Sequence, residues 1–264
     1  GRPVGPESQF CGGSMVLDRW VLTAAHCVHM QREDGTYADL PPQVLAVLTG
    51  TNVLAEGQGD LVPVESIFVN PQYRGDQFDH DVALIKLARA PQSQYTTVPL
   101  PNEDFGAILD QPGVPTVVTG WGLIDGGQRT AEMHQAQIQI LPREQCNNAM
   151  LEARAREAGP AIAYAGAVFG LTEQETEEVW AALIERVRPP MSATMLCSGT
   201  YEGGRTSCSG DSGGPLVVPL DDGSYIQAGI VSWGLTGEGG QGCAEDALFS
   251  AYMRTASYID WLNQ

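Results

Sequence analysis

The sequence has few basic residues and no long hydrophobic run. Its 264 residues include 14 lysines and arginines against 32 aspartates and glutamates, so the formal net charge is −18. A chain this acidic binds nucleic-acid phosphates poorly, and we expect no nucleic-acid partner. No stretch is long and apolar enough to span a membrane. No signal peptide is visible, although the sequence starts at Gly1 rather than Met, so a leader could have been removed.

The length and composition suit a globular protein. With 264 residues and 43% hydrophobic residues, the chain can form one large all-β domain or two small ones around a sizeable core. In the first part of the chain, short apolar runs alternate with turns rich in Gly, Pro, Asn and Asp. These runs cover residues 14–17, 44–48, 62–69 and 82–87. Short strands at such spacing predict barrels or sandwiches.

The stretch SCSGDSGGPL, residues 207–216, has the features of a nucleophile loop. Its glycines allow a peptide backbone to approach the Ser212 hydroxyl. The backbone N–H groups of Gly210 and Ser212 are available to bind an anion that forms beside this hydroxyl. Asp211 lies between them and needs a cationic partner if it is buried. As a bare pattern, Gly-x-Ser-x-Gly also fits the nucleophile elbow of α/β-hydrolases or an ordinary turn.

A serine nucleophile needs a base to take its proton and an acid to orient that base. The chain offers His26 within TAAHC at residues 23–27 and Asp81 within DHDVAL at residues 79–84. The order His, Asp, Ser differs from that of α/β-hydrolases and of subtilisin. The remaining acidic or basic candidates have no such context and are interpreted as ordinary core or surface residues: His29, His80, His134 and Asp79.

Seven short motifs occur in an order that resembles the trypsin/chymotrypsin family of serine proteases. They are CGGS (11–14), WVLTAAHC (20–27), DVAL (81–84), TGWG (119–122), GDSGGP (210–215), VSWG (231–234) and YIDWL (258–262). The resemblance runs from Cys11 to the C-terminus with one large interruption, as in a secreted, bacterial-type member with a long helical insert. It implies an all-β fold of two six-stranded antiparallel Greek-key barrels, with a helical insert in the second barrel and a C-terminal helix.

We expect a single peptidase domain over residues 1–264. The barrels are expected at about residues 10–110 and 111–250, joined near the proline-rich residues 99–115, with a C-terminal helix at about 255–263. The insert, at about residues 147–195, is predicted to contain helices at 143–157 and 172–187.

Thr172 and Glu175 form a capping-box pattern at the start of the second insert helix. One face of this helix is apolar, through Val179, Trp180, Leu183, Ile184 and Val187. Two interpretations of the insert remain open. In one, the hairpin packs on the second barrel; in the other, it forms a lid over the cleft.

The resemblance also implies an activity, that of a serine endopeptidase that works through an acyl-enzyme. In it, His26 is the general base and then the general acid, Asp81 orients the imidazole, and Ser212 is the nucleophile. Gly210 and Ser212 form the oxyanion hole. Ser232 adds a hydrogen bond to Asp81, unless it is simply a strand serine.

No cofactor or metal is expected. Residues 50–60 match a loop that binds calcium in trypsins, with Glu56 and Asp60 as possible ligands. Thr51 stands where a glutamate ligand is usual. Since a hard cation needs several oxygens, we expect a solvated acidic loop instead.

The resemblance implies that specificity follows from the family's primary pocket, which is neutral in this sequence. Its residues are Thr206 at the base, with Ser232, Trp233, Gly234 and Ser250 around it. Thr206 replaces the aspartate of trypsins, so we expect a peptide or protein substrate with an uncharged P1 residue, and a protein inhibitor as a further partner. Glu245 and Asp246 are expected on the rim, and Phe78 either in the next pocket or in the core.

The six cysteines allow fifteen pairings by number alone. The resemblance implies the pairs Cys11–Cys27, Cys146–Cys197 and Cys208–Cys243. Disulfides imply an oxidising compartment, so we expect secretion, either extracellular or periplasmic.

The Ile/Val-Val/Ile-Gly-Gly run of active family members is absent from the sequence. In the family the amino group of this run pairs with the aspartate that matches Asp211, its activation partner. We therefore keep two alternatives to the active protease: a latent precursor or fragment, and a non-enzymatic binding module on the same fold.

Overall fold

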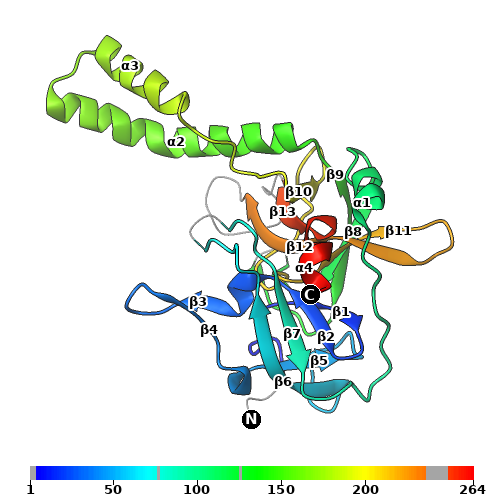
Figure 1. The fold of residues 1–264 in the computed structure, drawn as a ribbon. Coiled ribbons are helices and arrows are strands. Elements are labelled where there is room, and N and C mark those ends of the chain that lie inside the picture. The colour runs from blue at the N-terminus through cyan, green and yellow to red at the C-terminus, as the bar shows by residue number, and fades with distance from the viewer. Residues whose placement is uncertain (1–3, 76–77, 125–126, 236–248) are drawn as a thin grey trace. The chain divides into compact units, whose positions relative to one another are not determined.

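The computed structural model describes residues 4–75, 78–124, 127–235 and 249–264, and it contains two compact units (Figure 1). One unit comprises Gly1–Leu141 and Ala193–Gln264, and carries every strand found in the described residues. The other comprises Pro142–Ser192 and is helical. The predicted all-β fold with a helical insert and a C-terminal helix is confirmed.

The first sheet of the large unit is antiparallel and has five strands in the described residues, with an open edge at each end. In spatial order the strands are β1 (Ser14–Leu17), β2 (Trp20–Thr23), β7 (Ala83–Leu87), β6 (Asp60–Val69) and β5 (Ala46–Thr49). The expected sixth strand is therefore missing from the described residues. A barrel closes only when its two edge strands hydrogen-bond to each other, and β1 and β5 are not paired in this sheet. A cavity of about 520 Å³ is lined by residues of both edges, including Met15 and Leu48.

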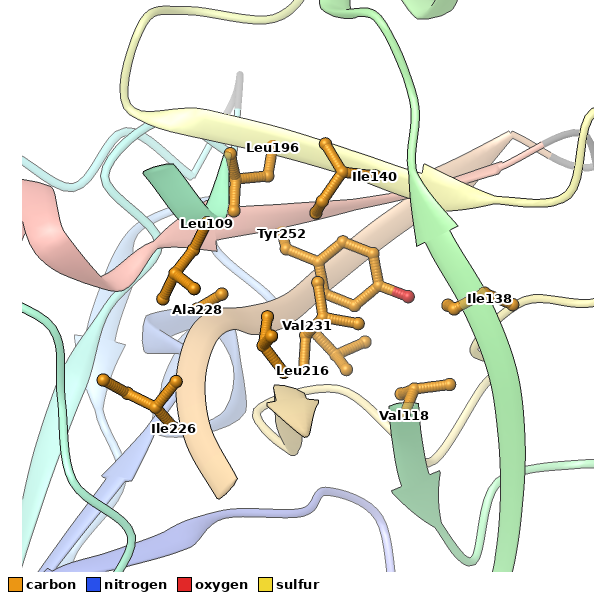
Figure 2. Close-up of a cluster of buried hydrophobic side chains, with 11 residues drawn as sticks. Leu109, Val118, Ile138, Ile140, Leu196, Leu216, Ile226, Ala228, Val231 and Tyr252 are labelled. Atoms are coloured by element: carbon orange, nitrogen blue, oxygen red, sulfur yellow. The ribbon is translucent and has the colours of Figure 1, made fainter. Parts of the chain in front are cut away.

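The second sheet closes into the expected six-stranded barrel. Around it run β10 (Met195–Gly199), β13 (Phe249–Arg254), β12 (Tyr225–Leu235), β11 (Pro215–Pro219), β8 (Pro115–Gly120) and β9 (His134–Ile140). Apolar side chains from all six strands fill its interior around the ring of Tyr252, as Figure 2 shows. Leu109 covers one end of this cluster. The barrel thus supplies a rigid base for the loops at its rim.

A two-stranded hairpin follows the short 3₁₀ helix η1 (Ala25–Cys27). Its strands are β3 (His29–Gln31) and β4 (Tyr37–Asp39), and His29 Nδ1 lies 2.6 Å from Asp39 Oδ1 across the register. The His29 ring also stacks on Tyr37. This hairpin was not predicted from the sequence, because its short strands carry no apolar alternation. A second 3₁₀ helix, η2 (Pro42–Val44), leads into β5.

The connection between the two sheets contains a helix that the sequence analysis did not predict, α1 (Glu103–Leu109). Asn102 caps it by accepting from the Phe105 N–H at 2.8 Å. Arg254 at the end of β13 donates to Glu103 and Asp110, which ties α1 to the barrel. The chain ends in η4 (Thr255–Tyr258) and α4 (Ile259–Leu262), within the predicted range 255–263.

The helical unit is a hairpin of α2 (Arg143–Phe169) and α3 (Glu173–Ile184). The predicted break after residue 157 is wrong, because α2 continues through Pro160 into a run rich in alanine, the best helix former. Gly170 ends α2 at φ +72°, and the Leu171 N–H reaches back to the Gly166 carbonyl at 2.9 Å. The predicted capping box of Thr172 and Glu175 opens α3.

The apolar residues of α3 all remain partly accessible to solvent, and none of them is buried. Gly166 allows α2 to approach Thr176 of α3 closely. The two interpretations of the insert, packing on the barrel or bordering the cleft, stay predictions. Among the described residues, no helix combines the length and the apolar character that crossing a membrane requires.

Candidate active site

His26 and Asp81 are joined by two hydrogen bonds. The His26 backbone N–H donates to Asp81 Oδ1 at 2.8 Å, and its Nδ1 lies 2.7 Å from Oδ2. Because a carboxylate only accepts, Nδ1 carries a hydrogen, and in the neutral imidazole Nε2 then keeps its lone pair. Ser232 donates a third hydrogen bond, to Oδ2. The Asp81 side chain is fully buried and that of His26 is 23% accessible, so the imidazole reaches the surface from a buried acid.

The turn before Asp81 is strained. Phe78 and His80 both have positive φ, at 51° and 53°, which non-glycine residues rarely adopt. The Arg74 N–H donates to the Asp79 carbonyl at 2.9 Å and so closes the turn. Phe78 is 39% exposed, and its ring meets the His26 ring edge-on at 5.6 Å. Phe78 was expected either in the next substrate pocket or in the core. It borders His26 and does not lie in the core.

Two tyrosines near Asp81 show how apolar this region is. Burial, together with the negative charge of Asp81, raises the pKa of Tyr73. Burial likewise raises the pKa of Tyr258 to about 12, with smaller contributions from Asp79 and Asp81. The Asp81 charge therefore acts in a region with little solvent to screen it.

The Ser212 loop packs against the segment that carries His26. The Ser212 carbonyl accepts from the Gly12 N–H at 2.7 Å, and Cys27 Sγ lies 3.6 Å from the same carbonyl. Cys27 Sγ is also 3.9 Å from His26 Nε2. Gly213 has φ +82°, and a Cβ there would lie 2.6 Å from the Gly12 carbonyl. Only glycine therefore allows this close approach.

The structure brings Ser212 beside His26 but does not join their reactive atoms. In the described part of the chain, the Ser212 hydroxyl and His26 Nε2 form no hydrogen bond. Such bonds are often long in ligand-free sites and shorten in the complex with substrate. In contrast, the side chains of His26 and Asp81 are hydrogen-bonded to each other, and so are those of Asp81 and Ser232.

The Gly210 turn is closed by its own backbone. The Asp211 N–H donates to the Cys208 carbonyl at 2.9 Å, and Gly210 adopts φ +103°. Within the described residues, the N–H groups of Gly210 and Ser212 donate to no protein acceptor. Both expected oxyanion donors are therefore available to a ligand.

Asp211 is a largely buried acid that is held by backbone groups. Its carboxylate accepts from the Gly122 and Cys208 N–H groups, each at 2.8 Å. Burial raises the pKa of Asp211, and these two N–H groups and the charge of His134 oppose the rise. A cavity of about 610 Å³ adjoins this carboxyl. His134, which we interpreted as an ordinary residue, also lines this cavity.

The expected pocket residues form a group of hydroxyls. The fully buried Ser250 hydroxyl bonds to Thr206 Oγ1 and accepts from Ser207 Oγ at 2.8 Å. Gly234 pairs with Ser250 across the β12–β13 ladder, and Trp233 precedes it on β12. Sequence reasoning missed Ser207, because nothing in the sequence shows that its side chain turns towards Ser250.

The remaining predicted sites fall into three groups. Cys11 and Cys27 form the expected disulfide. Cys146, Cys197 and Cys208 are also disulfide-bonded, and their expected pairings stay predictions. Cys243, Glu245 and Asp246 lie outside the described residues.

In the loop at residues 50–60, Asp60 is bound to a cationic side chain. Arg89 donates to both Asp60 carboxylate oxygens at 2.6 Å. This pair and the Gln92 N–H lower the pKa of Asp60 to about 2. The Asp60 carboxylate thus already has a positive partner, which weakens its case as a calcium ligand.

The comparisons with known proteins agree with this architecture. The family model described as Trypsin matches residues 3–262. The chain is 30% identical to Transmembrane protease serine 9 of Rattus norvegicus over 256 residues, which cover 96% of this chain and 19% of that protein. It is also 30% identical to Vitamin K-dependent protein C of Mus musculus over 263 residues, covering 96% and 45% respectively. The chain thus spans less than half the length of either relative. From the family match over nearly its whole length, the chain belongs to the trypsin family of serine proteases.

Proposed function

We propose that this chain is a serine endopeptidase that uses His26, Asp81 and Ser212. The observation that carries the proposal is the buried His26–Asp81–Ser232 hydrogen-bond network, which lies against the Ser212 loop. With Nδ1 bound to Asp81, the free Nε2 lone pair of His26 is the base. Imidazole is the side chain most often used as a general base, because it takes up and returns a proton readily.

The reaction follows from these positions in two halves. Ser212 Oγ attacks the scissile carbonyl while its proton passes to His26 Nε2, and Asp81 stabilises the resulting imidazolium. The N–H groups of Gly210 and Ser212 bind the oxyanion. Collapse of the tetrahedral intermediate breaks the C–N bond, and His26 returns the proton to the leaving amine. Water then repeats these steps on the acyl-enzyme and releases the acid.

The primary pocket favours an uncharged P1 residue. Its expected base, Thr206, is neutral, and its hydroxyl is already bound to Ser250. No carboxylate is present among Thr206, Ser250 and their partner Ser207 to pair with a basic side chain. Trp233 and Gly234 supply the edge along which a peptide substrate adds as a strand.

Asp211 is the proposed activation partner. Its carboxyl is buried, with a raised pKa, next to a cavity that can admit a further group. A cationic amino group there, as the family resemblance implies, would stabilise the carboxylate and hold the adjacent Gly210 turn. The latent precursor thus stays part of this proposal.

The remaining proposals concern setting and organisation. The Cys11–Cys27 disulfide favours an oxidising compartment, hence an extracellular or periplasmic protein. Proteins or peptides are the proposed substrates, and a protein inhibitor is a proposed partner. Residues 1–264 are proposed to act as one peptidase domain with the insert as an appendage.

The test is turnover of a protein substrate by the parent and by Ser212→Ala. The proposal expects hydrolysis to fall to background in the variant while the unfolding transition stays the same. Hydrolysis that survives in Ser212→Ala would refute it. Thr206→Asp tests the pocket: cleavage after Lys and Arg should rise, and no change in preference would contradict the assignment of Thr206.

A further inference from the structure

A short segment near the start of the chain contacts the nucleophile loop at two points. Gln9 Nε2 donates to the Gly210 carbonyl at 2.7 Å, and the Gly12 N–H donates to the Ser212 carbonyl at 2.7 Å. Thr23 Oγ1 in turn donates to the Gly12 carbonyl at 2.8 Å. Gln9 and Gly12 therefore donate hydrogen bonds to the carbonyls of the same two residues whose N–H groups face a forming oxyanion.

The Gly210 N–H can serve as an oxyanion donor only while the peptides on both sides of Gly210 keep their orientation. The preceding peptide is held at the Ser209 carbonyl by the Leu123 N–H, at 2.9 Å. The following peptide is held at the Asp211 N–H by the Cys208 carbonyl and at the Gly210 carbonyl by Gln9. Of these three contacts, only the one from Gln9 comes from a side chain.

Gly210 itself cannot provide this restraint. It has φ +103°, and a Cβ there would lie 3.1 Å from Gly122 Cα, so a larger residue would be both strained and crowded. Glycine is also the residue with the greatest backbone freedom. The orientation of its peptides must therefore be held from outside.

The Gln9 amide is packed closely against the Gly210 turn. Its Oε1 is buried and, among the described residues, has no hydrogen-bond partner. This oxygen lies 3.3 Å from where a Gly210 Cβ would be, so the amide faces the turn closely. The Gln9 backbone is held in place because its carbonyl accepts from Arg129 Nη1 at 3.3 Å. The Gln9 side chain is therefore fixed at both ends, by its backbone contact with Arg129 and by its amide contact with the Gly210 turn.

We propose that Gln9 is a positioning residue for the oxyanion hole, one that holds the Gly210 carbonyl so that the Gly210 N–H faces the developing negative charge. This inference rests on the proposed function. Gln9 acts only through Gly210 and does not touch the substrate. Its effect should therefore appear in the transition state rather than in substrate binding.

The experiment compares Gln9→Met and Gln9→Glu with the parent protein. Both variants keep the length of the side chain and remove the N–H donor. The matched control is Gln111→Met, which removes the same kind of bond, from Gln111 Nε2, just beyond helix α1, to the Ala107 carbonyl within it at 2.9 Å. Each protein is assayed with a fluorogenic peptide that has an uncharged P1 residue. Its affinities for the matching peptide aldehyde, a transition-state analogue, and for the matching peptide acid, a product, are measured as well.

Removing an oxyanion donor outright costs about 10²–10³ in kcat, so loss of its support should cost about tenfold. We expect that loss in kcat for both Gln9 variants, with KM within twofold. Affinity for the aldehyde should fall in parallel with kcat/KM, and affinity for the acid should stay unchanged. Gln111→Met should match the parent in every assay.

Three results would overturn the role of Gln9: an unchanged kcat in both variants, a loss confined to KM, or an equal loss in Gln111→Met. Unfolding curves of all four proteins show whether a loss of kcat comes from misfolding or from a displaced Gly210 peptide. If Gln9→Met folds poorly, the near-isosteric Gln9→Glu still provides the comparison. Failure of the proposed function is distinct from these results. It would appear as turnover that survives in Ser212→Ala, whatever Gln9 does.

Discussion

The Asp81 carboxylate contacts His26 through both of its oxygens: Oδ1 accepts from the backbone N–H at 2.8 Å, and Oδ2 lies 2.7 Å from ring Nδ1. The first bond fixes the position of the main chain, and the second fixes the ring and its tautomer. Together they hold the imidazole with Nε2 directed away from Asp81. If a hydrogen-bond donor replaces the Oδ2 acceptor, the ring hydrogen should therefore move from Nδ1 to Nε2.

The first prediction is that Asp81→Asn abolishes most of the activity while the protein still folds. An asparagine amide that faces Nδ1 donates a hydrogen bond, so the hydrogen moves to Nε2 and the base is lost. The same change in a serine-protease triad lowers kcat by about 10⁴. We expect a loss of that order at neutral pH, measured with a fluorogenic peptide. A loss below tenfold would contradict the role given to Asp81.

The second prediction concerns the contact between Gly213 and the His26 segment. In Gly213→Ala, the new methyl group would meet the Gly12 carbonyl at 2.6 Å and the Thr23 hydroxyl, at a backbone φ of +82°. We expect activity to fall by more than tenfold and the free energy of unfolding to fall by more than about 1 kcal/mol.

Gly223→Ala is the matched control, because Gly223 has φ +83° and nothing within 4 Å of an added Cβ. It carries the same backbone cost without the collision. Its stability should fall by only about 1 kcal/mol, and its activity should not change. If both alanine variants lose the same amount of activity and stability, the close approach of Gly213 to Gly12 is not required for function.

The third prediction is a pH dependence of stability from Asp211. Burial raises its pKa above the ordinary value of 3.8. The folded protein then holds this proton more tightly than the unfolded chain does. The stability contributed by Asp211 is thus complete below pH 3.8 and is lost as the pH rises through its higher folded pKa. Asp211→Asn removes this titration, so the Tm of the variant minus that of the parent should increase over this range.

Asp222→Asn gives the opposite sign and serves as the control. Hydrogen bonds from the Ser224 hydroxyl and N–H lower the pKa of Asp222. Its contribution is therefore present above the ordinary pKa and is lost as the pH falls through the lower folded value. A Tm difference for Asp211→Asn that is flat with pH, or that follows the Asp222→Asn trend, would contradict the third prediction.

The fourth prediction compares two ion pairs. Arg254, with a side chain 9% accessible, donates to both Glu103 oxygens at 2.8 and 2.7 Å and to Asp110. We expect Arg254→Gln to lower the free energy of unfolding by about 1–3 kcal/mol, because it removes charged hydrogen bonds of a buried side chain. The loss should not be larger, because solvent partly screens the contact with Glu103. Lys86→Gln breaks a pair with Glu65 in which the cation is 32% accessible, and it should cost at most about 1 kcal/mol. Equal effects in urea unfolding would contradict the structural role of Arg254.

Much of the architecture was predictable because its signals are local or belong to strong family motifs. The strand at Ser14–Leu17, the capping box at Thr172 and the pairing of Cys11 with Cys27 all follow the sequence-based expectations. The helix at Glu103–Leu109 did have a local signal, Asn102 followed by two acidic residues. That signal was overlooked among the prolines nearby.

Other features depend on contacts between distant residues and carry no local signal. Gln9 and Gly210 are 201 positions apart, and only the folded chain shows that they touch. The continuation of α2 through Pro160 needs the alanine-rich residues on both sides to outweigh the lost backbone hydrogen bond. The open edge between β1 and β5 likewise reflects which strands meet in space, which a pattern of short apolar runs does not determine.

The measurement that tests the central claim most directly is covalent labelling with a fluorophosphonate probe, followed by peptide mass spectrometry. The account predicts one adduct per chain, on Ser212, that is absent from Ser212→Ala and forms much more slowly in Asp81→Asn. An adduct on another residue, equal labelling of Ser212→Ala, or no adduct on the parent protein would contradict it.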